Sequence, residues 1–430
     1  MRLPEKRMQH SSSQTPTASD HQRPAKIAYI MSRFPKLTET FILYEILALE
    51  GLEVPVEIYP LLRARQHVAH SEAQRLVEQA HFHPFLSLPI LYAQWYFMRQ
   101  CPRTYFKLWA EVLRGSWGSV NFFIGALGIF PKAVRFAYEM VQQGITHVHA
   151  HFANHPAVAG LIIHRLTGIP FSFTAHGSDL HVERRMLDKK VAAAAFAITI
   201  SDYNRALMVQ ECGEEAQEKI CVLHCGVDPK VFSPHAHHNG AGPFQILCVG
   251  SFEEVKGHKY LIEACQLLRE RDVEFVCHLV GDGPLRRQVA AQIRRIGLQK
   301  QVRLYGGLPR HEVVKMHASA DVLVLASVPT QRGKREGIPV VLMEGMASGL
   351  PVVSSAISGI PELVESEQTG LLVPPRDATA LANALYRLWN DASLRDRLGR
   401  AGREKVLQEF NLPANAAELS QLFLQRSPVV

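Results

Sequence analysis

Short apolar runs alternate with amphipathic segments along most of the chain. In the first half, buried-strand patterns occupy residues 26–32, 54–59, 146–152, 170–175, 196–201 and 219–223. Helical patterns lie between them at 41–49, 157–166, 183–195 and 203–211. Strands that alternate with helices predict a parallel sheet covered on both faces.

A second alternating series follows a change in composition. Residues 226–243 are rich in Pro, His and Gly and predict a linker. Beyond it, strand patterns recur at 244–249, 274–280, 302–305, 321–326, 351–355 and 370–373, and late helices are predicted near 381–389 and 416–424. The predicted fold class is therefore α/β, with two doubly wound parallel sheets: a domain over 25–225, a second over 244–410, and a segment 411–430 that packs back across the boundary.

Composition narrows the kind of protein and its partners. With 430 residues, 47% of them hydrophobic and 20% charged, the chain predicts two or three globular domains. The net charge of +7 suits an anionic partner, and the absence of zinc-finger, helix-turn-helix and RNP-like patterns disfavours nucleic acid.

Seven cysteines without a C-x-x-C pair predict reduced thiols in a cytoplasmic protein. Residues 1–24 are polar and predict a disordered tail rather than a signal peptide, and without about 20 consecutive apolar residues we expect no membrane crossing.

The most informative stretch carries two glutamates, Glu336 and Glu344, at the start of an apolar helix. Pro339 suits the first helical position and Gly349 the far cap, so Glu336 belongs to the preceding loop and Glu344 to the helix. A carboxylate among apolar residues needs hydrogen-bond donors, which a ligand rich in hydroxyls supplies. The helix start, after Gly337 and Ile338, offers N–H groups and a positive dipole end to a diphosphate.

This stretch resembles the E-x7-E signature of retaining glycosyltransferases of family four, which have the GT-B fold. The resemblance implies that Glu336 contacts the hydroxyls of the donor sugar and Glu344 the ribose of the nucleotide. It also implies two Rossmann-like domains that face each other across a cleft. The spacing alone is equally compatible with a capped core helix in which Glu344 pairs with an arginine.

Two glycine-containing turns follow strands of the second domain. The first, with Gly250, Ser251 and Lys256, places N–H groups and a lysine where a phosphate could bind. In the family an arginine and a lysine of this loop hold the diphosphate; Lys256 matches the lysine, whereas Ser251 replaces the arginine. The cations that could substitute are Arg332, Lys334 and Arg335. The second turn, with Gly281 and Gly283, lacks the third glycine of a dinucleotide fingerprint, which disfavours a dehydrogenase. The resemblance places this turn at the edge of the nucleotide site. The sequence of the turn is equally compatible with an ordinary strand-to-helix turn.

The first domain contributes candidates at the ends of its strands. His176 follows a strand directly, and the resemblance places it beside the donor sugar and its diphosphate. His149 and His151 are expected, with His147, to form a polar wall of the cleft on the acceptor side, because three same-face imidazoles about 6 to 7 Å apart do not converge on one metal ion unaided. Arg33 and Lys36, in the loop after the first strand, could meet an acceptor diphosphate or be solvated. No D-x-D pair occurs, so we expect no metal and no cofactor other than the nucleotide-sugar substrate.

An insert at residues 61–138 is rich in aromatic and basic residues, including Trp95, Trp109 and Trp117. Such a mixture suits a surface helix in the headgroup layer of an anionic membrane. The alternative is that the aromatic rings fill the core of the first domain.

These features together predict a metal-independent, retaining glycosyltransferase. It would transfer a hexose from a nucleotide sugar, with UDP favoured, to a saccharide on a polyprenyl diphosphate in bacterial exopolysaccharide synthesis, at the inner face of the plasma membrane. The alternatives are a sugar epimerase or phosphorylase on the same architecture, and a non-catalytic, membrane-docked assembly subunit.

Overall fold

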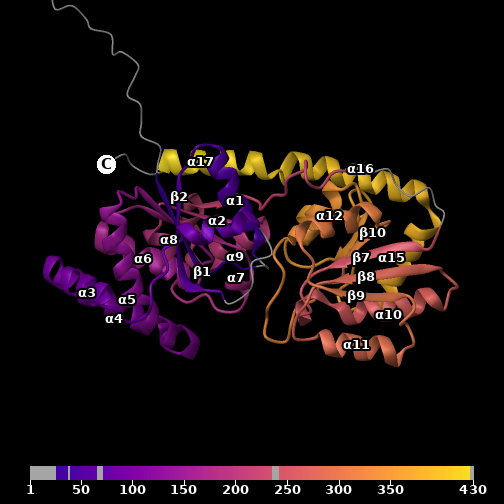
Figure 1. Ribbon diagram of the computed structural model, residues 1–430, viewed down its shortest axis with the longest axis horizontal. Helices are drawn as coiled ribbons and strands as arrows, with labels where there is room; N and C mark the ends of the chain where they lie inside the picture. Colours follow the sequence, from indigo (N-terminus) through magenta and orange to yellow (C-terminus); the bar gives the residue numbers. More distant parts are fainter. Residues whose placement is uncertain (1–25, 37–38, 65–70, 235–241, 427–430) are drawn as a thin grey trace, which may run out of the picture.

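The computed structural model describes residues 26–36, 39–64, 71–234 and 242–426. They form two six-stranded sheets in which every pairing is parallel (Figure 1). The strands of the first sheet are β1 (Ile27–Phe34), β2 (Val56–Arg63), β3 (His147–His151), β4 (Phe171–Ala175), β5 (Phe196–Thr199) and β6 (Ile220–Val222). Those of the second are β7 (Phe244–Val249), β8 (Phe275–Val280), β9 (Val302–Gly306), β10 (Val322–Leu325), β11 (Val352–Ser355) and β12 (Leu371–Val373). The predicted α/β class with two doubly wound parallel sheets is confirmed.

The order of the strands fixes where each sheet can hold a ligand. The first sheet runs β2-β1-β3-β4-β5-β6 and the second β12-β11-β10-β7-β8-β9. The chain therefore reverses direction across the first sheet between β1 and β3, and across the second between β7 and β10. In open α/β sheets ligands bind outside the carboxyl ends of the strands at such switch points.

Helices cover both faces of each sheet (Figure 1). In the first domain they are α1 (Thr40–Gly51), α2 (Ser71–Gln79), α3 (Leu88–Gln100), α4 (Pro102–Ser116), α5 (Val120–Gln142), α6 (His155–Thr167), α7 (Ser178–His181), α8 (Leu187–Ala193) and α9 (Asp202–Cys212). In the second they are α10 (His258–Arg269), α11 (Arg286–Arg295), α12 (Arg310–Ser319), α13 (Val340–Ala347), α14 (Ile360–Leu363), α15 (Ala378–Asn390) and α16 (Ala392–Glu409), and α17 (Leu412–Arg426) follows. Two 3₁₀ turns, η1 (Glu214–Lys219) and η2 (Glu254–Lys256), complete the described elements.

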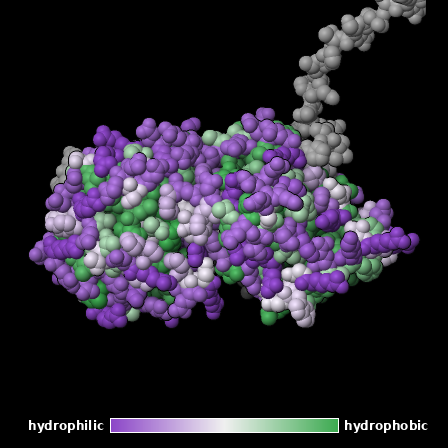
Figure 2. All heavy atoms as spheres, turned by 180° about the vertical axis from the view of Figure 1, so that it is seen from behind, coloured by the Kyte–Doolittle hydropathy of each residue, from purple (hydrophilic) through white to green (hydrophobic). Residues whose placement is uncertain are grey.

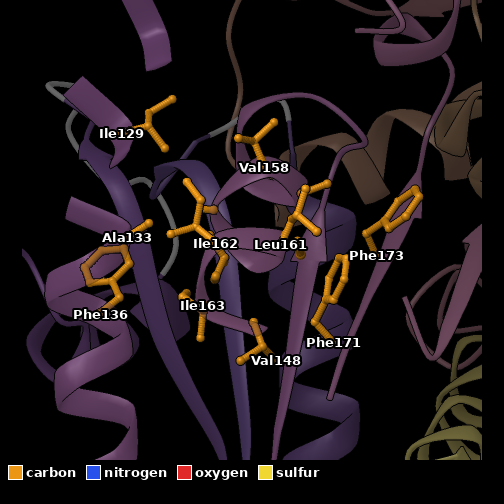
Figure 3. Close-up of a cluster of buried hydrophobic side chains, with 14 of the residues drawn as sticks. Ile129, Ala133, Phe136, Val148, Val158, Leu161, Ile162, Ile163, Phe171 and Phe173 are labelled. Carbon is orange, nitrogen blue, oxygen red and sulfur yellow. The ribbon is translucent and has the colours of Figure 1, made fainter. Parts of the chain in front are cut away.

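The core of the first domain joins α5 and α6 to the sheet. Figure 3 shows Ile129, Ala133 and Phe136 of α5 beside residues of α6, with Val148, Phe171 and Phe173 of the strands on the other side. α5 is 23 residues long, and among the described helices it alone is long and apolar enough to cross a membrane, although half of its apolar window is buried inside the protein. The sequence predicted no segment able to cross a membrane, and α5 is an exception by its length and apolar content. Because half of its apolar window is buried, α5 fits a core helix of the first domain.

The insert at 61–138 begins within β2 and forms α2 to α5. Part of it belongs to the core: Trp109 stacks on Phe130 with ring centroids 3.9 Å apart and donates a hydrogen bond to Tyr105 at 3.2 Å. Trp109 is thus half-buried and packs against the core, as the alternative interpretation of the insert expects. Trp95 and Trp117 are 50% and 72% exposed, so the insert combines core packing with an apolar surface.

Two chain crossings lie side by side between the domains. Val227 pairs with Asn411, with hydrogen bonds from the Val227 N–H to the Phe410 carbonyl and from the Leu412 N–H to the Val227 carbonyl. Beyond this crossing, α17 packs on α1, and its Ala416, Leu419 and Phe423 join the core of the first sheet. In Figure 1, α16 and α17 run in succession along one edge of both domains. The predicted tail at 1–24 lies outside the described residues, as does most of the second half of the predicted linker.

Candidate active site

The loops at the carboxyl ends of β7 and β8 pack backbone against backbone. The Gly250 N–H donates to the Val280 carbonyl, and the Phe252 N–H donates to the Asp282 carbonyl. A Cβ at Gly281 would lie 2.0 Å from the Gly250 oxygen, and one at Gly283 would lie 2.8 Å from the Phe252 nitrogen. Both glycines also have positive φ, so side chains are excluded there on two grounds. The two turns thus form one rigid floor at the switch point of the second sheet.

Lys256 and Glu336 meet above this floor. The Lys256 Nζ lies 2.9 Å from the Glu336 Oε1, and both side chains are mostly buried, at 18% and 14% exposure. Gly257, at the end of η2, holds the loop tight, since a Cβ there would lie 1.7 Å from the Ala326 oxygen. The predicted cation and the first glutamate of the pair are therefore in contact.

The second glutamate lies inside α13, which begins after Pro339 without a capping side chain. Glu344 is the fifth residue of this eight-residue helix and keeps only part of its surface exposed. Burial raises the pKa of Glu344 to about 7, and the nearby Arg310 opposes the rise. A carboxyl group in this setting lacks the solvation that an anion needs, and hydroxyl donors would supply it.

His176 and Gly177 bring the first domain against this assembly. A Cβ on Gly177 would lie 3.2 Å from the Gly337 Cα, and one on Gly337 would lie 2.4 Å from the His176 oxygen. The backbone after β4 therefore touches the loop between Glu336 and the start of α13. The three predicted parts of the site, around His176, Lys256 and Glu336, come together.

Polar contacts also join the two domains beside this assembly. The Glu362 carboxylate, in α14, accepts hydrogen bonds at 2.8 Å from the backbone N–H groups of Asp202 and Tyr203, at the start of α9. Arg335 donates to the Tyr203 hydroxyl at 3.0 Å. These hydrogen bonds hold the two domains against each other.

The strand histidines need a correction. His147, His149 and His151 are fully buried, so they do not form a wall of the cleft, and the predicted acceptor-side role of His149 and His151 is wrong. His149 lies opposite Ser172 in the parallel register, and its two ring nitrogens lie 2.8 and 3.0 Å from the hydroxyls of Ser172 and Thr174. Burial lowers the pKa of His147 to about 3 and that of His149 well below its usual value, so both rings are neutral.

Arg33 and Lys36 lie at the surface, but only Lys36 belongs to the loop after β1. Arg33, which was predicted in that loop, is part of β1 and pairs with Leu62 of β2. Both side chains are exposed, and Lys36 forms an ion pair with Glu39. Residues 37 and 38 of this loop are outside the described residues. The role of Arg33 and Lys36 in binding an acceptor diphosphate therefore stays a prediction.

Two buried side chains, Asp179 and Lys190, support the turn that carries His176. Asp179 accepts hydrogen bonds from the backbone N–H groups of Ala153, His176 and Gly177 at 2.6, 3.1 and 2.8 Å. Lys190 is buried beside it and donates to the carbonyls of Ala153 and Arg185; burial lowers the pKa of Lys190 to about 7. This pair fixes the turn that carries His176.

Two further residues were missed: Glu45 in α1 and Arg310 at the start of α12. Arg310 lies over the ring of Tyr44, 3.7 Å from its centroid, and so connects the second domain to α1. Glu45, His149 and His151 have ligand-type atoms within 4.8 Å of one another. Hydrogen bonds account for this grouping, because Tyr29 donates to Glu45 at 2.7 Å and the His149 ring is bonded to the two hydroxyls.

Known proteins resemble this chain over both domains. Residues 38–231 match the family Glycosyltransferase Family 4, and residues 233–405 match Glycosyl transferases group 1. The chain is 43% identical over 208 residues to WcaL of Escherichia coli strain K12, named as a colanic acid biosynthesis glycosyltransferase, which covers 48% of this chain and 51% of that protein. It is 38% identical over 205 residues to the amylovoran biosynthesis glycosyltransferase AmsK of Erwinia amylovora, covering 48% and 50%. The chain thus spans about half the length of these curated relatives.

Solved structures share the fold. Anabaena Alr3699/HepE in complex with UDP superposes with a TM-score of 0.70 at 17% identity, over 93% of this chain and all of that one. The sucrose-phosphate synthase of Thermosynechococcus elongatus gives 0.70 at 21% identity, over 93% and 98%. These likenesses confirm the GT-B fold. The two family matches, which together span most of the chain, show that it belongs to the glycosyltransferases, with a Glycosyltransferase Family 4 domain followed by a Glycosyl transferases group 1 domain.

Proposed function

We propose that this protein is a metal-independent, retaining glycosyltransferase that transfers a hexose from a UDP-sugar to a lipid-linked saccharide. The names of its relatives, which belong to colanic acid and amylovoran biosynthesis, support a role in exopolysaccharide assembly. The complex of the similar Anabaena protein with UDP supports the choice of nucleotide.

One observation carries the proposal: Lys256 and Glu336 form an ion pair beside the start of α13. Each partner neutralises the charge of the other. A bound nucleotide sugar would separate them, because its diphosphate attracts Lys256 and its sugar hydroxyls can donate to Glu336. Glu344, farther along the helix, would accept the ribose hydroxyls.

The chemical step follows from this placement. Negative charge grows on the departing diphosphate, and Lys256 and the start of α13 would stabilise it. The acceptor hydroxyl would attack from the same face and pass its proton to the leaving phosphate oxygen. Interactions that strengthen as charge develops lower the barrier more than they tighten substrate binding.

Lys334 is the best-placed substitute for the family arginine at Ser251. It forms an ion pair with Glu253, two residues beyond Ser251, whereas Arg335 is bonded to Tyr203 across the cleft. Arg332 is exposed. We therefore assign Lys334 as the second cation for the diphosphate.

The lipid-linked acceptor and an anionic membrane surface are supported by the insert. More than half of the exposed large apolar side chains of the described residues lie there: Phe85, Leu86, Leu88, Leu91, Tyr92, Trp95, Phe106, Trp117, Val120, Ile124 and Leu127. Single exposed apolar residues are ordinary, but a concentration of them marks an interaction surface. We call this set the insert patch.

Basic side chains accompany the insert patch. Arg99, Arg103, Lys107 and Arg114 are exposed on α3 and α4, and the Arg99 guanidinium lies over the ring of Trp95. These helices extend away from the rest of the first domain in Figure 1, and the right-hand end of Figure 2 shows pale and green surface between protruding purple side chains. Rings in the headgroup layer with cations on lipid phosphates would place the enzyme at the inner face of the plasma membrane.

A thermal-shift panel of UDP-, GDP- and ADP-sugars tests the donor. A ligand that binds only the folded form raises the melting temperature, so UDP-sugars should raise it most. The same UDP-sugar incubated without acceptor should remain unchanged, whereas conversion to another UDP-sugar would show an epimerase. A panel in which no nucleotide sugar changes the melting temperature would favour a non-catalytic subunit.

A further inference from the structure

The loop between α7 and α8, residues 182–186, packs against the corner between α4 and α5 of the insert. Two glycines of that corner leave room for the loop. A Cβ at Gly115 would lie 2.3 Å from the Met186 Cγ, and one at Gly118 would lie 3.1 Å from the Arg185 Nη2. Met186 itself has a φ of 58°, a left-handed conformation that is unfavourable for a residue with a side chain. Close packing thus holds Arg185 and Met186 in a conformation that is strained for the isolated loop.

The Arg185 guanidinium holds unused hydrogen-bond donors. Among the described residues it has no carboxylate and no hydrogen-bond acceptor as a partner, whereas the Nε of the adjacent Arg184 lies 3.5 Å from the Glu211 carboxylate. The Nη1, Nη2 and Cζ of Arg185 all lie within 4 Å of the Cβ position at Gly118, and the side chain is only partly exposed. A half-buried cation with unpaired donors is suited to bind an anion.

This guanidinium lies at one end of the insert patch. Gly118, which it covers, follows Trp117 and precedes Val120 in the chain, and these two apolar side chains are among the most exposed of the patch. Ile124 and Leu127 continue the exposed apolar face along α5 at helical spacing. A cation at the end of an apolar surface suits a phosphate that is attached to a lipid chain.

The backbone of the same loop is tied to the turn that carries His176. Lys190 donates hydrogen bonds to the carbonyl of Arg185, at 2.7 Å, and to that of Ala153. Asp179 in turn accepts from the N–H groups of Ala153 and His176 at 2.6 and 3.1 Å. Because Lys190 and Asp179 are buried, water competes little for these bonds. The backbone of Arg185 therefore keeps a fixed place relative to His176.

We propose that Arg185 binds the diphosphate of a lipid-linked acceptor, with the lipid chain along the insert patch and the saccharide directed toward His176. A planar guanidinium can donate two parallel hydrogen bonds to phosphate oxygens. Lys36, the other exposed candidate for this diphosphate, is already paired with Glu39. The identity of the acceptor rests on the proposed function, to which this site adds the residue that recognises the charged group. A phospholipid headgroup presents the same phosphate chemistry, so the experiment has to separate the two sources.

Co-sedimentation with two kinds of vesicle separates these sources. One kind is neutral phosphatidylcholine that contains geranylgeranyl diphosphate, and the other carries the same charge as phosphatidylglycerol; UDP is present throughout, so that the probe does not compete for Lys256. Arg185→Gln should weaken binding to the diphosphate vesicles about tenfold, because charge-assisted hydrogen bonds are lost, and should leave binding to phosphatidylglycerol unchanged. Arg165→Gln, an exposed position in the last turn of α6, removes the same charge and should change neither. An equal loss on both kinds of vesicle, or no loss in the folded variant, would overturn the proposal.

Chemical modification of the wild type tests the site without any variant. Phenylglyoxal reacts with accessible guanidinium groups, and geranylgeranyl diphosphate should protect Arg185 from it, as measured by mass spectrometry of peptides. Modification of Arg185 at an undiminished rate would refute the site even if Arg185→Gln does not fold.

Transfer assays separate this site from the proposed function. With a lipid-linked acceptor, Arg185→Gln should raise the acceptor KM about tenfold and leave the donor KM unchanged. Transfer with an unchanged acceptor KM would refute the site and leave the proposed function standing. Loss of diphosphate binding in Arg185→Gln, together with a wild type that transfers no sugar, would support the site and refute the proposed function.

Discussion

Replacing Glu344 by glutamine should change how the stability of the protein depends on pH. The pKa of Glu344 is raised to about 7 by burial, against an ordinary value of 4.5. An acid with a higher pKa in the folded protein holds its proton more tightly there than in the unfolded chain. Its contribution to stability is therefore present below about pH 4.5 and is lost as the pH rises through about 7.

The size of the effect follows from the difference between the two pKa values. A difference of about 2.5 units at 1.36 kcal/mol each gives a loss of about 3 kcal/mol between pH 4 and pH 8. This figure is an upper bound, because Glu344 keeps part of its surface exposed to water; the opposing effect of Arg310 is already contained in the pKa of about 7. Glu344→Gln keeps the shape of the side chain and removes this loss.

Urea unfolding of the ligand-free protein at a series of pH values measures the difference. The unfolding free energy of the wild type should fall relative to that of Glu344→Gln as the pH rises from 4.5 to 8. Glu404→Gln, at an exposed position of α16, is the control and should follow the wild type. Parallel pH profiles for the wild type and Glu344→Gln would refute the reasoning that this carboxyl group is held in a poorly solvated site.

Three further predictions concern the loops and the insert. Lys256→Ala should lower turnover at saturating donor as well as donor affinity, because charge on the leaving group grows in the transition state; activity that EDTA abolishes and manganese restores would contradict the metal-independent step. Gly337→Ala should hold the domains apart and lower activity, since its Cβ would lie 2.4 Å from the His176 oxygen, whereas Gly307→Ala has open space and should not; small-angle scattering should show a larger radius for the first variant only. The wild type should co-sediment with anionic vesicles, and less as salt rises, because lipid charge is screened beyond about 8 to 10 Å. A triple change to Glu at Arg99, Arg103 and Lys107 should abolish this binding, while the same change at Arg294, Arg295 and Lys300 of the second domain should not; equal binding by both triple variants would remove the membrane from the account.

The strands could be predicted from the sequence because parallel strands buried on both faces are apolar throughout. Each of the twelve predicted strands overlaps a strand of the structure. Helix α16 escaped notice because it is highly charged, and much of its packing is through Gly399 and Gly402, which let it approach neighbouring backbone closely. The helix predicted from residue 183 begins only at Leu187, after Met186 with a φ of 58°.

The site was predictable where local motifs carry it and not where distant residues meet. Glu336, Glu344, Lys256 and the glycine turns are recognisable from spacing within short segments. The burial of His149 depends on hydroxyls of the adjacent strand, Ser172 and Thr174, which the register brings opposite to it. Glu45 lies more than 100 residues before its partner His151, so no local pattern could connect them.

The central claim is that the second domain holds a nucleotide sugar through Lys256, Glu336 and Glu344, and calorimetric titration of UDP tests it most directly. The wild type should bind UDP, and Glu344→Ala, shown to be folded by circular dichroism, should bind it more weakly by about 2 to 4 kcal/mol, because a buried, charge-assisted acceptor is lost. Unchanged UDP affinity in the folded variant, or no binding by the wild type, would contradict the account.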